Sequence, residues 1–432
     1  MTRGGAGRLA LTAAIALLAA APFAEAQRIS NRGFADARVT FFPQDAAADD
    51  VHAVADVLVR DELFLKPAPW LQFAAGLDLR LNTHDQVDDS WRVDIGDRRR
   101  LRPAVSVRRL AATIARGPVT IDAGKQFIRW GKTDIVTPTD RFAPRDFLNV
   151  IDSEFLAVSG VRGVLQLGSH TLDLVWVPRL TPSRIPLLNQ RWAPVAPDPR
   201  IALSEIGAAI PEGAQAGIRY SRIAERLEYS VSVFDGFNHL PNIDVSTTLH
   251  AEHAERAEQS SSADAASSAS IGVRRVYPTM RAYGADVAMP TRWFTIKGEA
   301  AYSTSGTAGT DDYVLYVIQL ERQSGEWQLV AGYAGEAVTR RRAAATFAPD
   351  RGLTRSVVAR AAYTIDSNRS VAVEGAARQN ARGVYAKAEY SQARGPHWRA
   401  TFSGVLIAGR LDDFLGQYRR NSHLGAGLRY SF

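Results

Sequence analysis

The sequence predicts an all-β protein, a transmembrane antiparallel up-and-down β-barrel of about eighteen strands. Three observations predict this class. Apolar and polar residues alternate with a period of two along the chain after residue 26. Short and long connections between the alternating segments follow one another in turn. The chain ends on Phe432, with Tyr430 two residues earlier.

The alternation is clearest in the segment 71–82, where every odd position is apolar and the charged and amide side chains all occupy even positions. Lipid on one face and water on the other explain both halves of this pattern. A bilayer offers no hydrogen-bond partners for the backbone, so strands that cross it must close into a ring. The same pattern predicts strands at 33–42, 52–65, 70–82, 102–115, 118–129, 158–168, 170–178, 214–223, 226–236, 277–288, 292–303, 312–322, 325–336, 353–364, 369–379, 382–391, 397–407 and 420–432.

The connections give an independent check, because such barrels join their strands by short periplasmic turns and long extracellular loops. Short connections fall at every second position, namely 66–69, 116–118, 168–170, 224–226, 290–292, 323–325, 366–368 and 392–396. The others are long, apart from a tight one at 380–382, and include 83–101, 130–157, 179–213 and 237–276. An even strand number then places both ends of the barrel in the periplasm.

The first 26 residues have the pattern of a signal peptide. Arg3 and Arg8 precede an apolar run at 9–21, and Ala24-Glu25-Ala26 forms a cleavage site. Residues 27–432 are therefore expected to form a single barrel domain. After residue 26 no stretch approaches the eighteen or so apolar residues of a membrane-spanning helix, which argues against a helical inner-membrane transporter.

The last segment, 420–432, places Leu424, Leu428, Tyr430 and Phe432 on one face. It resembles the C-terminal strand by which outer-membrane barrels are recognised for insertion. The resemblance implies that Tyr430 and Phe432 are the insertion signal, that the barrel-assembly machinery is a partner, and that the protein resides in the outer membrane of a Gram-negative bacterium.

A second resemblance lies at 124–146. Gly124-Lys125-Gln126 and Arg129-Trp130-Gly131, followed by an Asp- and Pro-rich stretch, resemble the large Gram-negative porins of the alginate-export type and their uncharacterised relatives. Lys125 stands where an Arg is usual, and about twenty residues match. The resemblance implies that the loop 130–157 folds into the pore and narrows it. The candidate constriction residues are Trp130, Asp134, Asp140 and Asp146.

Two alternatives stay open for this segment. The loop 130–157 is instead an extracellular turn if Gly131, Pro138 and Pro144 only reverse the chain. Strict alternation would also aim Lys125 at lipid, and a β-bulge near Gly124 would turn it inward.

The charges on the predicted lumen face are mixed, with a basic surplus, and the whole chain carries a net charge of +7. A basic surplus attracts anions, so we expect a preference for anionic or polar solutes. The alternative is that these charges pair with one another and keep the lumen wet. The candidate pore-lining and selectivity residues are Arg38, Arg80, Lys125, Arg129, Arg162, Arg219 and Arg399.

Arginines also cluster at the predicted outer strand ends, where guanidinium groups suit the phosphates of lipopolysaccharide. The clusters are Arg98–Arg100, Arg274–Arg275, Arg340–Arg342 and Arg419–Arg420. Nucleic acid is not an expected partner, because the interleaved aromatic residues lie on the lipid face.

The predicted function is a porin-like channel for passive diffusion or export of small polar, anionic solutes. An outer-membrane enzyme and an adhesive or structural barrel are the alternatives. The sequence holds neither a G-x-S-x-G nor an H-E-x-x-H motif, and no cofactor is expected. His250 and His253 have the spacing of a metal site, but they lie on a low-complexity loop, so we expect no metal there. The sequence does not distinguish a monomer from a trimer.

Overall fold

The computed structural model describes residues 29–193, 201–248, 269–342 and 345–432. The predicted signal peptide and the pair His250 and His253 lie outside these ranges.

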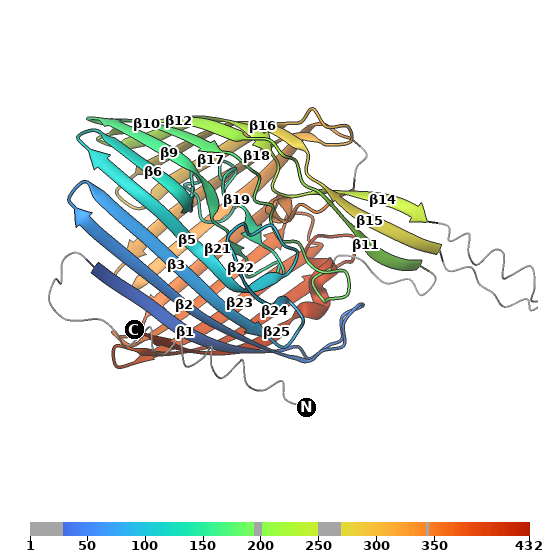
Figure 1. Cartoon of the computed structure of the whole chain (residues 1–432). Coiled ribbons are helices and arrows are strands. Elements are labelled where there is room, and N and C mark those ends of the chain that lie inside the picture. Colours follow the sequence, from blue (N-terminus) through green and yellow to red (C-terminus); the bar gives the residue numbers. More distant parts are fainter. Residues whose placement is uncertain (1–28, 194–200, 249–268, 343–344) are drawn as a thin grey trace, which may run out of the picture.

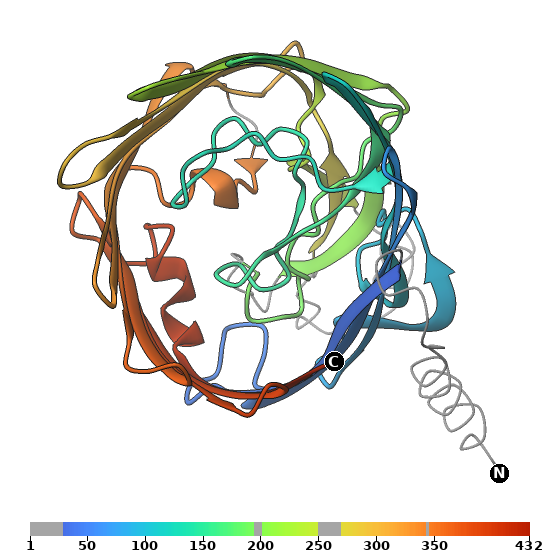
Figure 2. The same cartoon turned by 90° about the vertical axis from the view of Figure 1, so that its left-hand side faces the viewer.

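The described residues form a closed antiparallel ring of eighteen strands, which Figure 2 shows in a view along its axis. Every predicted strand overlaps one strand of the ring, so the prediction is confirmed. In order, the strands are β1 (Ile29–Phe41), β2 (Ala53–Ala68), β3 (Leu71–Asn82), β5 (Arg102–Arg116), β6 (Val119–Gln126), β9 (Val158–Leu167), β10 (His170–Val177), β12 (Gln215–Ala224), β13 (Leu227–Phe237), β16 (Thr279–Pro290), β17 (Thr295–Thr304), β18 (Asp312–Ser324), β19 (Trp327–Arg340), β21 (Ser356–Thr364), β22 (Arg369–Arg378), β23 (Gly383–Arg394), β24 (Trp398–Gly409) and β25 (His423–Ser431).

The last strand closes the ring against the first. Phe34 lies opposite Ser431 in the β1–β25 register. The backbone nitrogen of Gly33 donates to the Phe432 carbonyl at 2.9 Å, and the nitrogen of Phe432 donates to the Gly33 carbonyl at 3.0 Å. A Cβ at Gly33 would overlap the Phe432 ring. The C-terminal aromatic residue is therefore paired by its backbone and packed against the first strand.

Short turns lie at one end of the barrel, on the left of Figure 1, and the long connections lie at the other. Four of the turns contain a glycine in the left-handed region, with φ between 56° and 64°, at Gly117, Gly168, Gly325 and Gly395. The predicted alternation of short and long connections is thus confirmed. We call these ends the turn end and the loop end.

Some of the predicted loops contain strands. β11 (Ile201–Ala209), β14 (Asn242–Thr248), β15 (Ala269–Val276) and β20 (Ala345–Thr346) form a separate sheet. Its strands β11, β14 and β15 project beyond the loop end (Figure 1). β4 (Val87–Asp94) pairs with the start of β5. Because β11 and β15 pair in parallel across a long separation in sequence, local alternation does not reveal them. The description of 179–213 and 237–276 as loops was incomplete.

Several predicted boundaries differ from the observed ones by three residues or more; the strand predicted at 33–42, for example, begins at Ile29. The strand predicted at 118–129 ends at Gln126, and the one predicted at 420–432 begins at His423 because a 3-10 helix, η3 (Gly416–Asn421), precedes it. A second 3-10 helix, η2 (Pro349–Arg351), lies in the connection before β21. Among the described residues no helix is long and apolar enough to cross a bilayer.

The barrel encloses two apolar clusters on its inner side, while its outer face carries exposed Leu, Val, Ile and aromatic side chains. In the first cluster Ile128, Trp130 and Phe142 pack against β9, β10, β13 and β16. In the second, side chains from several connections meet β22 and β24; they are Phe147, Val150, Trp192, Leu240, Phe347, Leu415 and Tyr418. Burying these side chains fixes the connections inside the ring.

Candidate functional site

The site is the barrel interior, which is crossed by the connection between β6 and β9. We call residues 127–157 the inner loop. In the view along the barrel axis, this segment lies within the outline of the ring (Figure 2). The inner loop contains a short ladder between β7 (Arg145–Asp146) and β8 (Glu154–Phe155). Its contacts with Glu299 of β17 and Gln319 of β18 place the segment inside the ring.

Glu299 on β17 holds the first half of the inner loop, which follows β6. Glu299 is only 3% exposed. Its carboxylate accepts hydrogen bonds from the backbone nitrogens of Lys132 at 2.8 Å, Thr133 at 3.0 Å and Thr139 at 2.8 Å. The hydroxyl of Thr139 donates to it as well, at 2.8 Å. A buried carboxylate is stable when it accepts several such bonds, so Glu299 is the anchor of this half.

Asp134 is held in a reciprocal pair beside this anchor. Its backbone nitrogen donates to Gln319 Oε1 at 2.9 Å, and Gln319 Nε2 donates to its carboxylate at 2.7 Å. Lys297 Nζ lies 3.6 Å from the same carboxylate. Burial opposes ionisation, but the hydrogen bonds and the lysine charge outweigh it and lower the pKa of Asp134. Its side chain remains largely exposed, at 65%.

Asp140 and Trp130 are both buried. One oxygen of Asp140 accepts bonds from the backbone nitrogens of Trp130 and Gly131, both at 2.6 Å. The indole of Trp130 donates to Asp173 of β10 at 3.1 Å. The Arg129 guanidinium lies 3.3 Å from the other Asp140 oxygen. These contacts hold the shape of the inner loop, and Asp140 also borders the interior cavity described below, whereas Trp130 does not.

Asp146 belongs to a buried ion cluster that also contains Lys125. Its carboxylate accepts bonds from Arg102 at 2.9 and 3.0 Å and from Arg184 at 3.2 Å. Arg184 also binds Asp97 at 2.8 Å, and Lys125 Nζ binds Asp97 at 2.5 Å. Despite burial, the two arginines hold the pKa of Asp146 well below its usual range. Lys125 is 3% exposed and is a structural group here.

The expected bulge at Gly124 is absent, because the pairing of β6 with β5 and β9 runs through this residue without a shift. Gly124 has φ of 122° instead, and a Cβ there would overlap the Leu110 carbonyl. The inward turn of Lys125 therefore comes from a backbone conformation that favours glycine.

Arg38 and Arg80 bind the second half of the inner loop, which precedes β9. Arg38 contacts Asp152 at 2.8 Å, and Arg80 contacts Glu154 at 2.6 Å. Burial raises the pKa of Glu154, but Arg80 and Arg60 outweigh it and bring it down to about 2. Both predicted arginines thus face the interior.

The other predicted basic residues divide into paired and unpaired groups. Arg162 binds Asp173 at 2.6 Å and Arg219 binds Asp286 at 2.8 Å, both on the wall beneath the inner loop. Arg399, near the turn end, lies opposite Arg429 in the β24–β25 register. Within the described ranges no carboxylate lies within 4.0 Å of Arg399.

An open cavity of about 430 Å³ remains between the inner loop and the wall from β18 to β23. Arg145 borders it and was not predicted. Its guanidinium lies 4.0 Å from the centre of the Phe155 ring, and that of Arg129 lies 4.1 Å from the same ring. Burial and the Arg129 charge lower the pKa of Arg145. Across the described residues it has no carboxylate within 4.0 Å.

The comparisons with solved structures match this arrangement over almost the whole chain. A BenF-like porin from Pseudomonas fluorescens Pf-5 superposes with a TM-score of 0.55 at 8% identity, covering 94% of this chain and 97% of that one. The fold is that of an outer-membrane porin. Two further structures superpose in the same way. Acinetobacter baumannii OccAB4 has a TM-score of 0.52 at 9% identity, covering 95% of this chain and 100% of that one. Pseudomonas aeruginosa OpdQ has a TM-score of 0.51 at 9% identity, covering 93% of this chain and 98% of that one. No protein-family model and no curated protein matches the chain.

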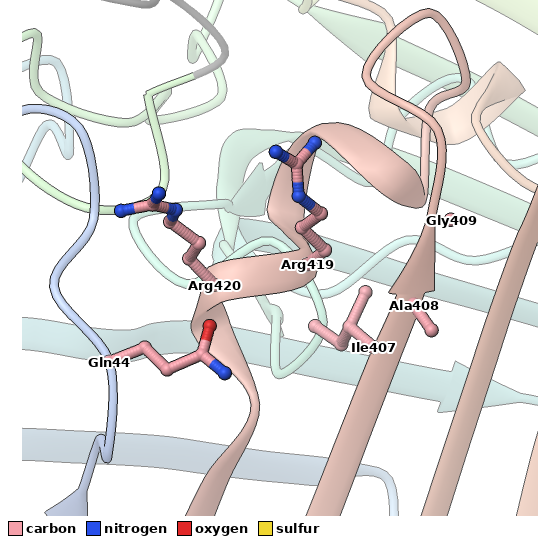
Figure 3. A pocket seen from close by; sticks show the side chains of 6 residues that line it. All are labelled: Gln44, Ile407, Ala408, Gly409, Arg419 and Arg420. Atoms are coloured by element: carbon pink, nitrogen blue, oxygen red, sulfur yellow. The ribbon is translucent and has the colours of Figure 1, made fainter.

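In outer-membrane barrels of this fold the short turns face the periplasm and the long loops face the outside. A pocket of about 520 Å³ lies at the loop end, between the end of β24, Gln44 and η3. Figure 3 shows Arg419 and Arg420 leaving η3 next to each other at its border. Arg420 donates to the Asp45 carbonyl at 3.2 Å.

Proposed function

We propose that this protein is a passive channel through which small polar solutes cross the outer membrane, by diffusion or export, with a preference for anions. The observation that carries the proposal is the closed ring with a charged interior, narrowed but not filled by the inner loop. A ring of eighteen strands leaves room for an aqueous path. The test is conductance of the refolded protein in a planar bilayer, where stepwise openings are expected.

The anion preference rests on the guanidinium groups that lack a nearby carboxylate. Most basic residues of the interior are neutralised in pairs, such as Arg162 with Asp173 and Arg219 with Asp286. Arg145 at the cavity and Arg399 near the periplasmic mouth are not. Uncompensated charge in a narrow, water-poor region attracts anions more strongly than paired charge does.

The substitution Arg145→Gln is expected to move the zero-current potential in a salt gradient toward cation preference. The double variant R219Q/D286N is the matched control, because it removes a cation and the anion paired with it and leaves the net charge of the lumen unchanged. An equal shift for both variants, or none for either, would count against an Arg145 role. The stepwise channel itself would still be established.

For lipopolysaccharide, the pair Arg419 and Arg420 is the best-placed of the predicted arginine clusters. Several of the others are occupied by acids: Arg99 contacts Asp88, while Arg100 and Arg275 share Glu205. A phosphate of the lipopolysaccharide core suits the guanidinium groups of two consecutive arginines at the extracellular mouth. The double substitution of both arginines by alanine should reduce the lipopolysaccharide that copurifies with the barrel.

For insertion, Tyr430 and Phe432 are proposed as the signal read by the barrel-assembly machinery. Both rings are about one-third exposed, and their centres are 6.4 Å apart beside Trp398 and the seam with β1. Phe432→Ala should lower the amount of protein inserted in cells more than it lowers refolding into detergent.

For catalysis, the arrangement that most resembles an enzymatic pair is Ser183 with His239. The hydroxyl lies 2.8 Å from His239 Nδ1 and also accepts a bond from the Arg145 backbone nitrogen at 2.8 Å. Both residues are buried, and burial lowers the pKa of His239 to about 3. We infer that the pair connects three loops and that the protein is not an enzyme.

A further inference from the structure

A hollow of about 600 Å³ lies on the outer wall of the barrel, over β18 to β23. The registers explain it. Across five neighbouring strands Leu320 lies opposite Ala331, Ala331 opposite Ala359, Ala359 opposite Gly375, and Gly375 opposite Ala386. Four small residues thus follow one another along one outward row. Because their side chains are short, the wall is thinner there than on either side.

Larger apolar side chains border this row. Leu320 and Leu329 are 41% and 38% exposed, and Val373 is 56% exposed, so this face points toward lipid. Leu320 and Leu329 lie close to the turn at Gly325, and Val373 lies close to the start of β22. The hollow is therefore in the half of the wall nearest the periplasm, where an acyl chain of that leaflet would reach it.

The periplasmic rim of the hollow carries positive charge. Phe294 and Arg322 border the hollow. The Arg322 guanidinium lies 5.7 Å from the Trp293 ring centre, and that of Arg292 lies 5.0 Å from it. Two guanidinium groups therefore lie near one exposed indole ring, at the height of the barrel where aromatic side chains contact lipid headgroups. Among the described residues no carboxylate lies within 4.0 Å of either.

We propose that this surface binds one anionic phospholipid of the periplasmic leaflet. The phosphate lies between Arg292 and Arg322 beside Trp293, and one acyl chain fills the hollow over Ala331, Ala359 and Gly375. Guanidinium forks suit phosphate, and an exposed Trp suits the headgroup level. The methylene groups of an acyl chain lying in the hollow make apolar contacts with its walls. Lipid packed against a flat part of the barrel does not make these contacts. The site lies outside the solute pathway.

The barrel also offers a matched control at the same rim. The Arg116 guanidinium lies 4.8 Å from the Trp70 ring centre, at the turn between β5 and β6. Neither residue borders the hollow. Arg116→Ala removes one guanidinium from an indole at the periplasmic level, and it leaves the hollow and the pair at Trp293 intact.

The test is lipid titration of the detergent-purified barrel, with bound lipid counted by native mass spectrometry. Phosphatidylglycerol should bind at one lipid per barrel and resist removal, and phosphatidylcholine with the same acyl chains should bind more weakly. The double variant R292A/R322A should bind phosphatidylglycerol about tenfold more weakly. Ala359→Leu, which fills the hollow without changing charge, should weaken it similarly, and Arg116→Ala should not. Millimolar inorganic phosphate should not displace the lipid.

Three results would overturn the proposal: unchanged binding in both the double variant and Ala359→Leu, equal loss in Arg116→Ala, or displacement of the lipid by phosphate alone. Heat-modifiable migration on gels shows in each case that the variant barrel is folded. None of these outcomes bears on channel activity, which is measured separately.

Discussion

Glu299 and Thr139 are joined twice, because the carboxylate accepts both the backbone nitrogen and the hydroxyl of the threonine, each at 2.8 Å. The two residues are 160 positions apart in the chain. This contact holds the inner loop, which follows β6, against β17 on a distant part of the wall.

Glu299→Gln should loosen the inner loop. A carboxylate accepts at both oxygens, whereas a glutamine would turn an NH₂ group toward backbone N–H donors. The expected cost is about 2 kcal/mol in the free energy of unfolding, measured in urea, with faster proteolysis between residues 130 and 145. Glu389→Gln is the control: among the described residues, the ion-pair partner of that carboxylate is the partly exposed Lys387, so its loss should cost under about 1 kcal/mol. Equal effects in the two variants would contradict the anchor.

Lys125→Met should destabilise the barrel by about 3 kcal/mol, because it leaves Asp97 buried with one cation instead of two. Thermal unfolding measures the loss. The double variant K125M/D97N should recover part of it, since the uncompensated charge is then gone. If the double variant is no more stable than K125M, the Lys125–Asp97 pair does not account for the loss.

Gly124→Ala should cost about 1–3 kcal/mol, because φ of 122° is strained for any side chain and the new Cβ would overlap the Leu110 carbonyl. Gly163→Ala on β9 is the matched control: a Cβ there meets nothing within 4 Å. Urea unfolding should separate the two substitutions clearly. Two equally mild effects would show that the backbone at Gly124 relaxes easily.

Stability should fall in mild acid because of His239. Its folded-state pKa is about 3, whereas an unfolded histidine has a pKa of about 6.5. Between these pH values the histidine is protonated in the unfolded state and neutral in the folded state. The free energy of unfolding therefore decreases as the pH drops from about 6.5 toward 3, by up to about 1.4 kcal/mol per pH unit. His239→Gln should flatten the unfolding free energy over this range. An unchanged slope would mean that other groups control it.

The strands could be predicted because lipid and water impose a strict period of two on them. The predicted ranges 70–82 and 102–115 each differ from the observed strands, β3 and β5, by one residue. Lumen-facing positions such as Arg38 and Arg80 follow from the same parity. Pairing across long separations leaves no local trace, which is why the sheet of β11, β14, β15 and β20 was missed.

The inner loop was predicted from a resemblance, but the roles of its residues were not. Asp140 was expected at the constriction, yet its oxygens face the backbone of Trp130 and Gly131. Arg145 carried no signal in the sequence, because its position depends on the ladder between β7 and β8 and on the ring of Phe155. The orientation of a side chain in an irregular segment depends on tertiary contacts rather than on periodicity.

The central claim is tested most directly by single-channel recording of the refolded protein in a planar bilayer, with and without residues 132–152. The account predicts stepwise openings of the intact protein and larger openings of the shortened one, because the inner loop narrows the path. A folded barrel that stays electrically silent in both forms would contradict the channel.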